Sequence, residues 1–378
     1  MGDQLKIPFS IYRGGTSKAV FFLAEDIPPS GAMRDRFLLR ILGKPDPDEI
    51  DGIGGGHLRT SKVGILSPSQ RPGINIDYTF GQIALDRDIV DYRSNCGNIS
   101  AAVAAFAIDR GYANVESDRA HVAVYNTNTD KTLYMQVPLA DGEAAAIGDF
   151  AIAGIPGTGA RIDLDFRHTI GANTGKLLPT GNTIDEIPLS DGSIVRVSIT
   201  DAAIAVGHVL ARDMGIKGDE TPAQLRSNTA LIQRFQELRA KVAQKSGIVQ
   251  TGNEVASNLL IPFISIISPP RDYRDTHGNL ILGENVDFLA RLMAVNSCHP
   301  AYAGTGACST AACSAIAGTL VNQLLQGQNK SEIRIGHPLG AMPVQVERGR
   351  GDAFQKLAYA RTARRLIEGY TYIPKNYF

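Results

Sequence analysis

The 378-residue sequence has no tryptophan, only four cysteines and no surplus of charge of either sign. Lysine plus arginine (38) equals aspartate plus glutamate (38), so no global field would recruit nucleic acid or an anionic membrane. Four cysteines are too few for a disulfide framework in so long a chain, and no Cys-x-x-Cys or His-x-x-x-His spacing indicates a metal site. We therefore expect reduced thiols, no metal and no nucleic-acid partner.

Long apolar runs are also missing. No stretch approaches the roughly 18 uninterrupted apolar residues of a membrane span, and Met1–Lys6 has no run of signal-peptide length. We expect a cytoplasmic protein without a membrane partner. At about 100–200 residues per domain the length predicts about two domains, and 43% hydrophobic residues suffice for two sizeable cores.

The most informative stretch that is present is Asn95-Cys96-Gly97-Asn98, because an almost wholly apolar run to Ile108 follows it. This pattern predicts a buried helix with a cysteine at its N-terminus. The free N–H groups and partial positive charge of such a helix end stabilise a thiolate and bind a carboxylate or phosphate. On these residues alone, an inert core thiol is an equally good interpretation.

A second stretch, Ala303 to Gly318, repeats the first about half a chain later. With Ala303 aligned to Cys96, a glycine falls on Gly97 and small apolar residues follow for several helical turns. The repeat favours a duplicated architecture in which the first copy presents a thiol and the second a methyl group.

Short β-branched or alternating segments bounded by Gly, Pro, Asp and Asn predict strands around each apolar helix. In the first half these are 7–12, 19–23, 62–66, 74–80, 122–126 and 133–137, around a helix over 97–110. In the second half they are 194–199, 204–210, 261–267, 286–293, 333–335, 342–347 and 355–361, around a helix over 306–326. A further amphipathic surface helix is predicted from Thr221 to Gly247, with Thr as N-cap and Gly as C-cap. The Gly- and Thr-rich stretch 171–182 suggests a boundary between domains 1–180 and 181–378.

Two glycine-containing loops supply further candidate groups. Residues 51–62 form a glycine-dense loop that ends in Thr60, Ser61 and Lys62, whose donors suit a carboxylate. The loop lacks the spacing of a nucleotide phosphate-binding loop, and a strand rather than a helix follows it. The second loop runs from Arg13 to Lys18, where an arginine fork suits a carboxylate. A solvated strand-end lysine and a surface ion pair are the plainer interpretations of these two loops.

Eight motifs in order along the chain resemble the 2-methylaconitate isomerase family, and 4-oxalomesaconate tautomerases most of all. They are Arg13-Gly-Gly-Thr-Ser-Lys18, Asp51-Gly-Ile-Gly-Gly55, Thr60-Ser-Lys-Val63, Asn95-Cys-Gly-Asn98, Leu178-Pro-Thr-Gly-Asn182, the His299 to Gly306 segment, His337-Pro338 with Gly340, and Arg361-Thr-Ala-Arg364. The resemblance implies an α+β fold of two similar diaminopimelate-epimerase-like domains, each with strands around a central helix, and a site in the cleft between the domains.

The resemblance also assigns roles. Racemases of this fold place one thiol at the head of each central helix, so Ala303 disfavours two-thiol stereoinversion, whereas Lys62 and Cys96 match the two positions of the family's proton transfer. No cofactor is implied, because fixed donors can stabilise a dienolate. The expected substrate-binding residues are Arg13, Ser17, Ser61, Gly97, Asn98, Asn182, Arg271, His299, Gly304, Thr305 and Gly306.

Three readings of the function stay open. The first is an isomerase or tautomerase that moves a proton along a small unsaturated tricarboxylate, with 4-oxalomesaconate as the best guess. The second is the same chemistry on 2-methylaconitate or aconitate. The third is a non-catalytic carboxylate-binding protein on the same fold. The expected partner in every case is a small unsaturated di- or tricarboxylate, and the sequence also permits a homodimer.

Overall fold

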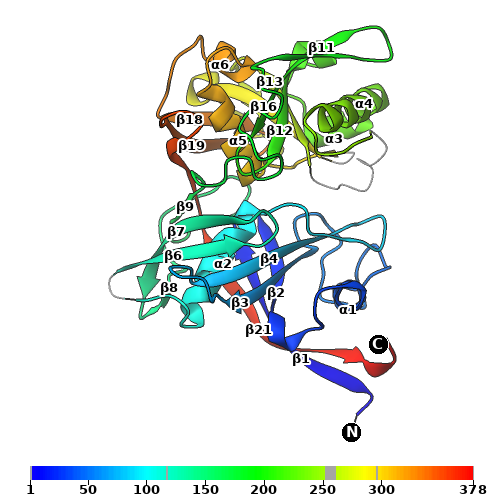
Figure 1. Ribbon diagram of the computed structural model, residues 1–378, viewed down its shortest axis with the longest axis vertical. Helices are drawn as coiled ribbons and strands as arrows, with labels where there is room; N and C mark the ends of the chain where they lie inside the picture. The colour runs from blue at the N-terminus through cyan, green and yellow to red at the C-terminus, as the bar shows by residue number, and fades with distance from the viewer. Residues whose placement is uncertain (1, 116–117, 252–260, 295–296, 378) are drawn as a thin grey trace. The chain divides into compact units, whose positions relative to one another are not determined.

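The computed structural model describes residues 2–115, 118–251, 261–294 and 297–377 (Figure 1). The chain forms two compact units: unit 1 comprises residues 1–164 and 360–378, and unit 2 comprises residues 165–359. The sequence suggested a boundary at residues 180/181, with all later residues in the second domain. The C-terminal segment belongs to unit 1 because β21 (Ala363–Pro374) pairs antiparallel with β1 (Gln4–Gly14) from Gln4↔Pro374 to Gly14↔Ala363.

Unit 1 is a mostly antiparallel sheet with one helix buried in it and one lying on it. The sheet order is β21-β1-β2-β3-β4-β6-β7, with parallel pairs at β2–β3 and β4–β6. The remaining bounds in this unit are α1 Ala32–Leu42, α2 Gly97–Asp109, β2 Ser17–Leu23, β3 Lys62–Pro68, β4 Ile76–Ile83, β5 Val90–Asp91, β6 Arg119–Asn126, β7 Lys131–Ala140, β8 Glu143–Ala144, and the short helices η1 Ala24–Asp26 and η5 Lys375–Tyr377.

Helix α2 is the core of unit 1, as predicted. All of its residues from Gly97 to Ile108 are buried, and β1, β2, β6, β7, β8 and β21 pack against it. A helix that is hydrophobic on every side can be stable only with neighbours on every side. Gly14 of β1 allows the closest approach, since a Cβ there would lie 2.1 Å from the carbonyl oxygen of Asn98.

Unit 2 repeats this plan around α5 (Gly304–Ser314), which is buried along its whole length and contacts β11, β12 and β19. Its sheet order is β10-β11-β12-β13-β16-β18-β19-β20. The other bounds are β10 Asp185–Pro188, β11 Ile194–Asp201, β12 Ala205–Leu210, η2 Ala211–Met214, α3 Pro222–Ser227, α4 Thr229–Lys245, β13 Phe263–Ser268, β14 Tyr273–Arg274, β15 Leu280–Ile281, η4 Gly283–Asn285, β16 Phe288–Ala294, β17 Ser297–Cys298, α6 Leu320–Leu324, β18 Glu332–His337 and β19 Gly340–Arg348. The chain passes between the units within β9 (Ile162–Asp165) and at β20 (Phe354–Arg361).

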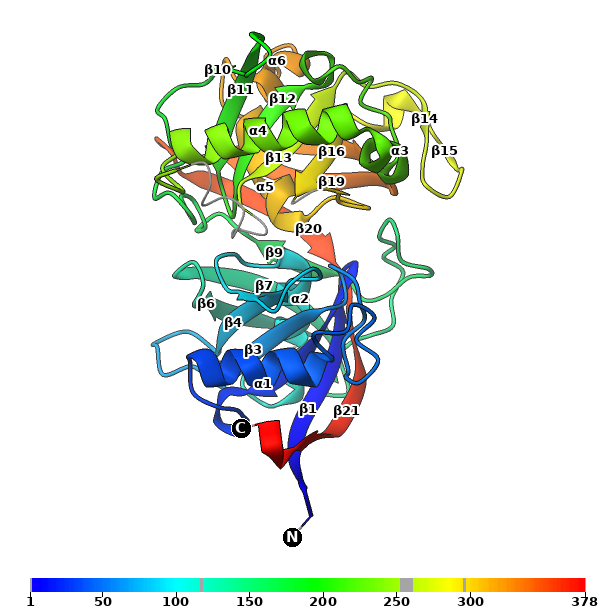
Figure 2. The same ribbon diagram turned by 90° about the vertical axis from the view of Figure 1, so that its right-hand side faces the viewer.

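The two units have the same sequence of strand directions. The series β1, β2, β3, β4, β6, β7 is paired antiparallel, parallel, antiparallel, parallel, antiparallel, and the series β11, β12, β13, β16, β18, β19 is paired identically. Helix α1 falls between β2 and β3 as α3 and α4 fall between β12 and β13, and each lies across the strands of its own unit (Figure 2). The duplication predicted from the sequence is confirmed.

Two predicted helices are each interrupted. The helix predicted over 306–326 is divided into α5 and α6 because Gly318 takes a left-handed φ of +87° and the Thr319 hydroxyl caps a new helix by accepting from the Asn322 N–H. The helix predicted over 221–247 is divided at Asn228, whose side chain caps α4 through the Leu231 N–H. The predicted cap at Thr221 is confirmed and forms a capping box with Gln224.

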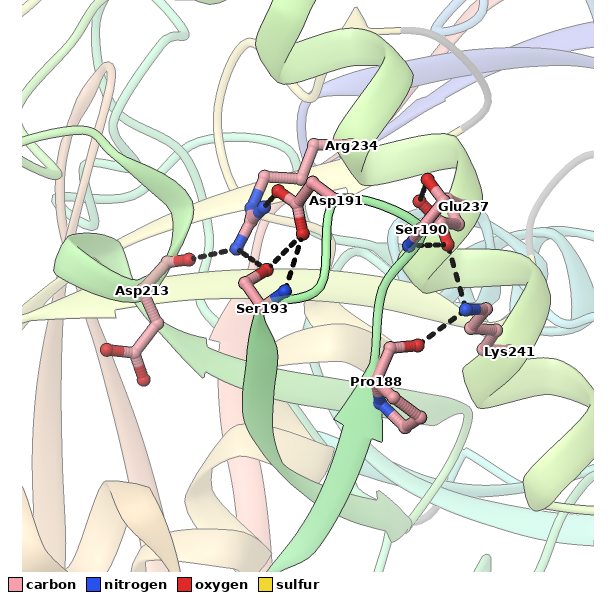
Figure 3. Close-up of polar contacts among 8 residues, drawn as sticks. All are labelled: Pro188, Ser190, Asp191, Ser193, Asp213, Arg234, Glu237 and Lys241. Atoms are coloured by element: carbon pink, nitrogen blue, oxygen red, sulfur yellow. Dashed lines mark hydrogen bonds and ion pairs between the residues drawn. The ribbon is translucent and has the colours of Figure 1, made fainter.

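Polar contacts fasten α4 to the β10–β11 turn (Figure 3). Arg234 donates to the Asp191 carboxylate, to Ser193 Oγ (3.0 Å) and to the backbone carbonyl of Asp213 (3.0 Å). Glu237 accepts from the backbone N–H of Ser190 at 2.7 Å. These contacts fix the outer edge of unit 2 and hold η2 in place.

In the described ranges, no helix is long and apolar enough to cross a membrane.

Candidate functional site

Lys62 is a buried lysine at the first position of β3. Only 6% of the residue is exposed, and its Nζ donates to Oε1 of Gln82, its partner across the β3–β4 pair. The same Nζ lies 5.0 Å from the centre of the Phe80 ring. Burial lowers the pKa of Lys62, while the charge of Cys96 opposes that shift. Lys62 is therefore not a solvated strand-end lysine, because its environment favours the neutral amine.

The loop before Lys62 is held by a buried carboxylate. Oε2 of Glu49 accepts from the backbone N–H groups of Gly55 (2.6 Å) and Gly56 (3.0 Å) and from Ser61 Oγ (2.7 Å). Ser61 is fully buried, and its carbonyl accepts from Gln82 Nε2 at 3.1 Å. The contacts of Ser61 thus fix the start of β3. In this structure its hydroxyl donates to Glu49 within the loop.

Cys96 is the N-cap of α2, as the sequence predicted. Its backbone is extended (φ −116°, ψ 101°), its side chain caps no helical N–H, and its carbonyl accepts from the Ser100 N–H at 2.9 Å. Gly97 and Asn98 follow, both buried in the first turn. First-turn N–H groups have no helical acceptor, so this end offers donors and a positive potential beside a half-buried thiol.

Tyr78 adds a second buried titratable group to this region. It is 0% exposed, and its hydroxyl has no hydrogen-bond partner among the described residues. Burial, and after it the charge of Cys96, raises the pKa of Tyr78. The phenol therefore stays protonated, and Lys62 and Tyr78 both lie within the electrostatic reach of Cys96.

The predicted loop from Arg13 to Lys18 packs against the first turn of α2. Asn98 donates to Thr16 Oγ1 at 3.1 Å and accepts from Arg361 Nε at 2.8 Å. Arg13 donates to the carbonyls of Gly15 (3.1 Å) and Thr362 (3.0 Å), and its pKa is lowered by burial and then by Arg364. Ser17 is buried at the start of β2. The structure thus brings Arg13, Ser17, Asn98 and Cys96 together in unit 1.

The start of α5 repeats the geometry without the thiol. Ala303 is the N-cap, with extended φ −64° and ψ 133°, and Gly304, Thr305 and Gly306 are buried in the first turn. A Cβ on Gly304 would lie 2.1 Å from the hydroxyl oxygen of Tyr359, so only glycine fits under that ring. The first-turn N–H groups of these three residues have no helical acceptor, and their role as donors to a carboxylate stays a prediction.

The strand registers show that Lys62 and Phe263 are equivalent positions. Leu23 and Leu210 each precede a short 3-10 helix, and they pair with Leu66 and Ile267 respectively. Four residues earlier stand Lys62 in unit 1 and Phe263 in unit 2. Both proton-transfer candidates, Lys62 and Cys96, thus have apolar counterparts in unit 2.

Three predicted substrate-binding residues lie elsewhere in unit 2. Asn182 is exposed and donates to the Asp185 carboxylate at 2.9 Å, which stabilises its own turn. Arg271 is exposed and follows the C-terminal end of β13. Gly306 packs near Phe263, at the N-terminal end of the same strand. At the rise of an extended chain, the two ends of β13 are about 17 Å apart. His299 is half-buried, and its Nδ1 accepts from the Ala301 N–H at 3.1 Å, two residues before the N-cap of α5. Of these three, only His299 lies close to α5 in sequence.

The other three cysteines are fully internal. Cys298, Cys308 and Cys313 are buried, and burial raises the pKa of Cys298 and of Cys313 to about 12. They differ from Cys96 in both exposure and environment.

Sequence reasoning missed Gln82, Tyr78, Glu49 and Arg361 as neighbours of the candidate groups. Alternation along β4 signals two of them, because Tyr78, Phe80 and Gln82 lie on one face of that strand. Glu49 gave no local signal, since its partners lie in a later loop. Arg361 stood in one of the family motifs, but nothing in the sequence indicated that it donates to Asn98.

Comparisons with known proteins identify the family of this chain. A family profile described as "PrpF protein" matches residues 4–374. The chain is 43% identical over 378 residues to the 3-methylitaconate isomerase of Eubacterium barkeri, with 99% of each chain covered. It is 34% identical to the 2-methyl-aconitate isomerase of Shewanella oneidensis (98% of each covered) and 34% identical to the 4-oxalomesaconate tautomerase of Pseudomonas putida (99% and 98% covered).

Solved structures give the fold. A methylitaconate-delta-isomerase superposes with a TM-score of 0.84 at 42% identity and covers 100% of this chain and 97% of its own. A hydroxyproline epimerase from Agrobacterium vitis, at 11% identity, superposes with a TM-score of 0.55 over 98% of this chain and 93% of its own. The expected epimerase-like α+β fold is confirmed.

Proposed function

This chain belongs to the PrpF family and is an isomerase of small unsaturated carboxylates, and from that premise we propose that it moves a proton along the allylic system of an alkyl-substituted itaconate. The observation that carries the chemistry is the buried Lys62, which is held by Gln82 within the electrostatic reach of Cys96. The higher identity to the 3-methylitaconate isomerase (43%) than to the tricarboxylate enzymes (34%) favours a dicarboxylate substrate.

The proposed reaction is redox-neutral and balances without a co-reactant. In 3-methylitaconate the C3–H bond breaks, and its electron pair forms the C2=C3 double bond. The π electrons of the C2 methylene group then take up a proton at the methylene carbon, which becomes a methyl group. The product is a 2,3-dimethylbutenedioate, and the dienolate between the two steps carries the charge that fixed donors must stabilise.

We assign the proton abstraction to Lys62 and the proton return to Cys96. A neutral amine is a competent base, and burial lowers the pKa of Lys62, which favours that form. A thiol at a helix N-terminus can donate its proton and leave a thiolate that the helix end stabilises. After one turnover Lys62 holds the proton taken from C3, and Cys96 has lost its own proton to the product. A proton transfer from Lys62 to Cys96, directly or through solvent, restores the starting state.

Donors for the carboxylates and the dienolate come from groups already in place. The N–H groups of Gly97 and Asn98 start α2, and Arg13 and Ser17 lie in the loop packed against that turn. We extend the proposal to Gly304, Thr305 and Gly306 with His299, whose N–H groups and imidazole suit a carboxylate equally.

Proton exchange in deuterated water tests the assignment. Wild-type protein with 3-methylitaconate should exchange the C3 proton and form product. Lys62→Met should lose both activities, whereas Cys96→Ser should keep exchange at C3 while product formation falls at least about a hundredfold, the scale of a general acid. Loss of exchange in Cys96→Ser with exchange retained in Lys62→Met would reverse the two roles. Lys131→Met, on β7 of the same unit, is the matched control and should behave as wild type.

The substrate is tested separately with a panel. The kcat/KM for 3-methylitaconate should exceed those for 2-methylaconitate, aconitate and 4-oxalomesaconate. The second candidate is 4-oxalomesaconate, which the eight sequence motifs favour. A higher kcat/KM for any tricarboxylate would overturn the dicarboxylate assignment but leave the roles of Lys62 and Cys96 intact.

A further inference from the structure

Unit 2 contains a cavity of about 470 Å³ that the isomerase chemistry does not use. This volume lies within the range of small-molecule sites. The cavity lies between the C-terminal ends of β12 and β13 and helix α6, and is lined by Leu210, Ala211, Arg212, Ile216, Lys217, Ile267, Ser268, Pro269, Arg271, Leu320, Gln323 and Leu324.

All three ionisable residues of this lining are cationic: Arg212, Lys217 and Arg271. Nearby carboxylates are occupied by other groups. Glu220 accepts from the backbone N–H groups of Lys217 (2.7 Å) and Gly218 (2.8 Å), and Asp272 accepts from that of Gly283 (2.8 Å). Asp213 lies 3.6 Å from Arg212, whose side chain is 74% exposed, so this pair is weak. The charged side chains that line the cavity itself are thus all positive, and these carboxylates lie outside the lining.

Ser268 supplies a buried polar group in the same wall. The residue is 3% exposed, and its Oγ has no hydrogen-bond partner among the described residues. Gly218, with φ +96°, leaves room for it, since a Cβ there would lie 2.3 Å from this oxygen. A buried hydroxyl without a partner costs free energy, so a ligand oxygen that reached it would recover that loss.

Apart from Gln323, the rest of the lining is apolar. Ile216, Ile267, Leu320 and Leu324 offer aliphatic surface beside the cations. The η2 segment that carries Arg212 is held through Arg234 on α4, which donates to the Asp213 carbonyl while the Asp213 carboxylate points away from it (Figure 3). The wall is therefore largely preformed.

The fold itself does not require these cations. The position equivalent to Arg212 in unit 1 is Glu25, because each is the second residue of the short helix that follows Leu210 or Leu23. Two copies of one plan carry opposite charge at this place, which indicates a role particular to unit 2.

We propose that this cavity binds a small organic anion with one carboxylate group and an apolar body. The carboxylate lies among Arg212, Lys217 and Arg271 with the Ser268 hydroxyl as a further donor, and the apolar body covers the leucines of α6. This site lies in unit 2, whereas Lys62 and Cys96 belong to unit 1.

Because the chain has no tryptophan, Gln323→Trp places a single indole reporter in the cavity lining. In that background we would titrate 4-phenylbutyrate and its uncharged analogue 4-phenylbutyramide by tryptophan fluorescence. The carboxylate should bind at least about fivefold more tightly than the amide, the scale of one or two partly exposed ion pairs, and its affinity should fall as salt rises. Equal affinity for the two probes, or no binding at millimolar concentration, overturns the proposal.

Variants locate the binding. Arg212→Gln with Lys217→Gln should weaken 4-phenylbutyrate binding about tenfold and leave the amide unchanged, and Ser268→Ala should weaken the carboxylate selectively. Lys217→Arg should bind as the parent does. Lys176→Gln, an exposed lysine elsewhere in unit 2, is the matched control. If Lys176→Gln weakened binding as much as the double variant, the effect would be general surface charge and the site would be excluded. Activity is not the readout, so failure of this proposal leaves the isomerase assignment unaffected.

Discussion

Lys62 and Phe263 occupy equivalent first positions of β3 and β13 in two copies of one strand plan. The same relation holds between Cys96 and Ala303 at the heads of α2 and α5. Both residues to which we assign the proton transfer therefore lie in unit 1, while unit 2 keeps the helix N-terminus but has Ala303 and Phe263 at the equivalent positions. A protein built for two-sided stereoinversion would need a proton donor in each copy.

The four cysteines should differ sharply in their reaction with iodoacetamide. Cys96 is half-buried at a helix N-terminus, whereas burial raises the pKa of Cys298 and Cys313 to about 12 and Cys308 is 0% exposed. Alkylation needs the thiolate, so the native protein at pH 8 should gain one adduct by intact mass spectrometry. Cys96→Ser should gain none in the same time, and the unfolded wild type should gain four. An adduct on a second cysteine of the native protein would contradict this reading.

Gln82 should tune the pH dependence of activity through Lys62. Gln82→Leu removes the polar group beside the buried amine, which lowers the pKa of Lys62 further and moves the acidic limb of kcat/KM to lower pH. Gln82→Glu adds a negative charge, raises the pKa and moves the limb to higher pH. Shifts of about one pH unit in opposite directions are expected in pH–rate profiles. Movement of both variants in the same direction would show that the limb reports another group.

Glu49→Ala should loosen the loop that leads into Lys62. The substitution removes a carboxylate that accepts three hydrogen bonds, so the free energy of unfolding should fall by about 2–3 kcal/mol in a urea titration. Trypsin should then cleave faster after Arg59 within this loop. Glu25→Ala, at an exposed carboxylate of the same unit, should change neither measurement. Unchanged cleavage in Glu49→Ala would mean that other contacts hold the loop.

His208 should make unit 2 less stable in mild acid. It is fully buried between the Ser198 carbonyl (3.0 Å) and Thr310 Oγ1 (3.1 Å), and burial lowers its pKa to about 4. Between the unfolded pKa of about 6.5 and the folded value, only the unfolded state binds the proton, so stability falls as pH falls through this window, by at most about 3 kcal/mol.

Urea titrations between pH 7.5 and 5 check the effect of His208. His208→Gln keeps both hydrogen-bonding partners but cannot titrate, so the free energy of unfolding should depend less on pH than in the wild type. The exposed His121→Gln should leave the wild-type slope unchanged. A slope in His208→Gln equal to that of the wild type would assign the acid sensitivity to other groups.

The sequence was sufficient to predict the helices and strands whose own residues carry a clear apolar pattern. Helix α2 was predicted because every face is apolar, and most strands because their side chains alternate or are β-branched. The caps Asn228 and Thr319 divide longer predicted helices, because a single polar side chain can satisfy a helix end once its backbone turns.

Elements that depend on distant partners were not predicted. Strand β21 is largely exposed and charged, and it exists through pairing with β1 at the other end of the sequence. Helix α1 does have a local signal, since Phe37, Leu38, Ile41 and Leu42 form one buried stripe, but charged residues lie next to them in the sequence.

For the site, the position of Cys96 could be predicted from the apolar helix that follows it. The contact between Lys62 and Gln82 could not, because it depends on the β3–β4 register. Arg271 follows the C-terminal end of β13, and its role in substrate binding stays a prediction.

The pairing of β1 with β21 also sets an order of events on the ribosome. Residues 165–359 emerge before β21 does, so unit 2 can fold while unit 1 still lacks an edge strand. Until then the segment of β1 from Gln4 to Phe9, which precedes its pairing with β2, has no strand beside it. Domains usually fold in the order in which they are synthesised. Here the unit that carries Lys62 and Cys96 is completed after the other, so these two residues belong to a finished unit only once β21 has been synthesised.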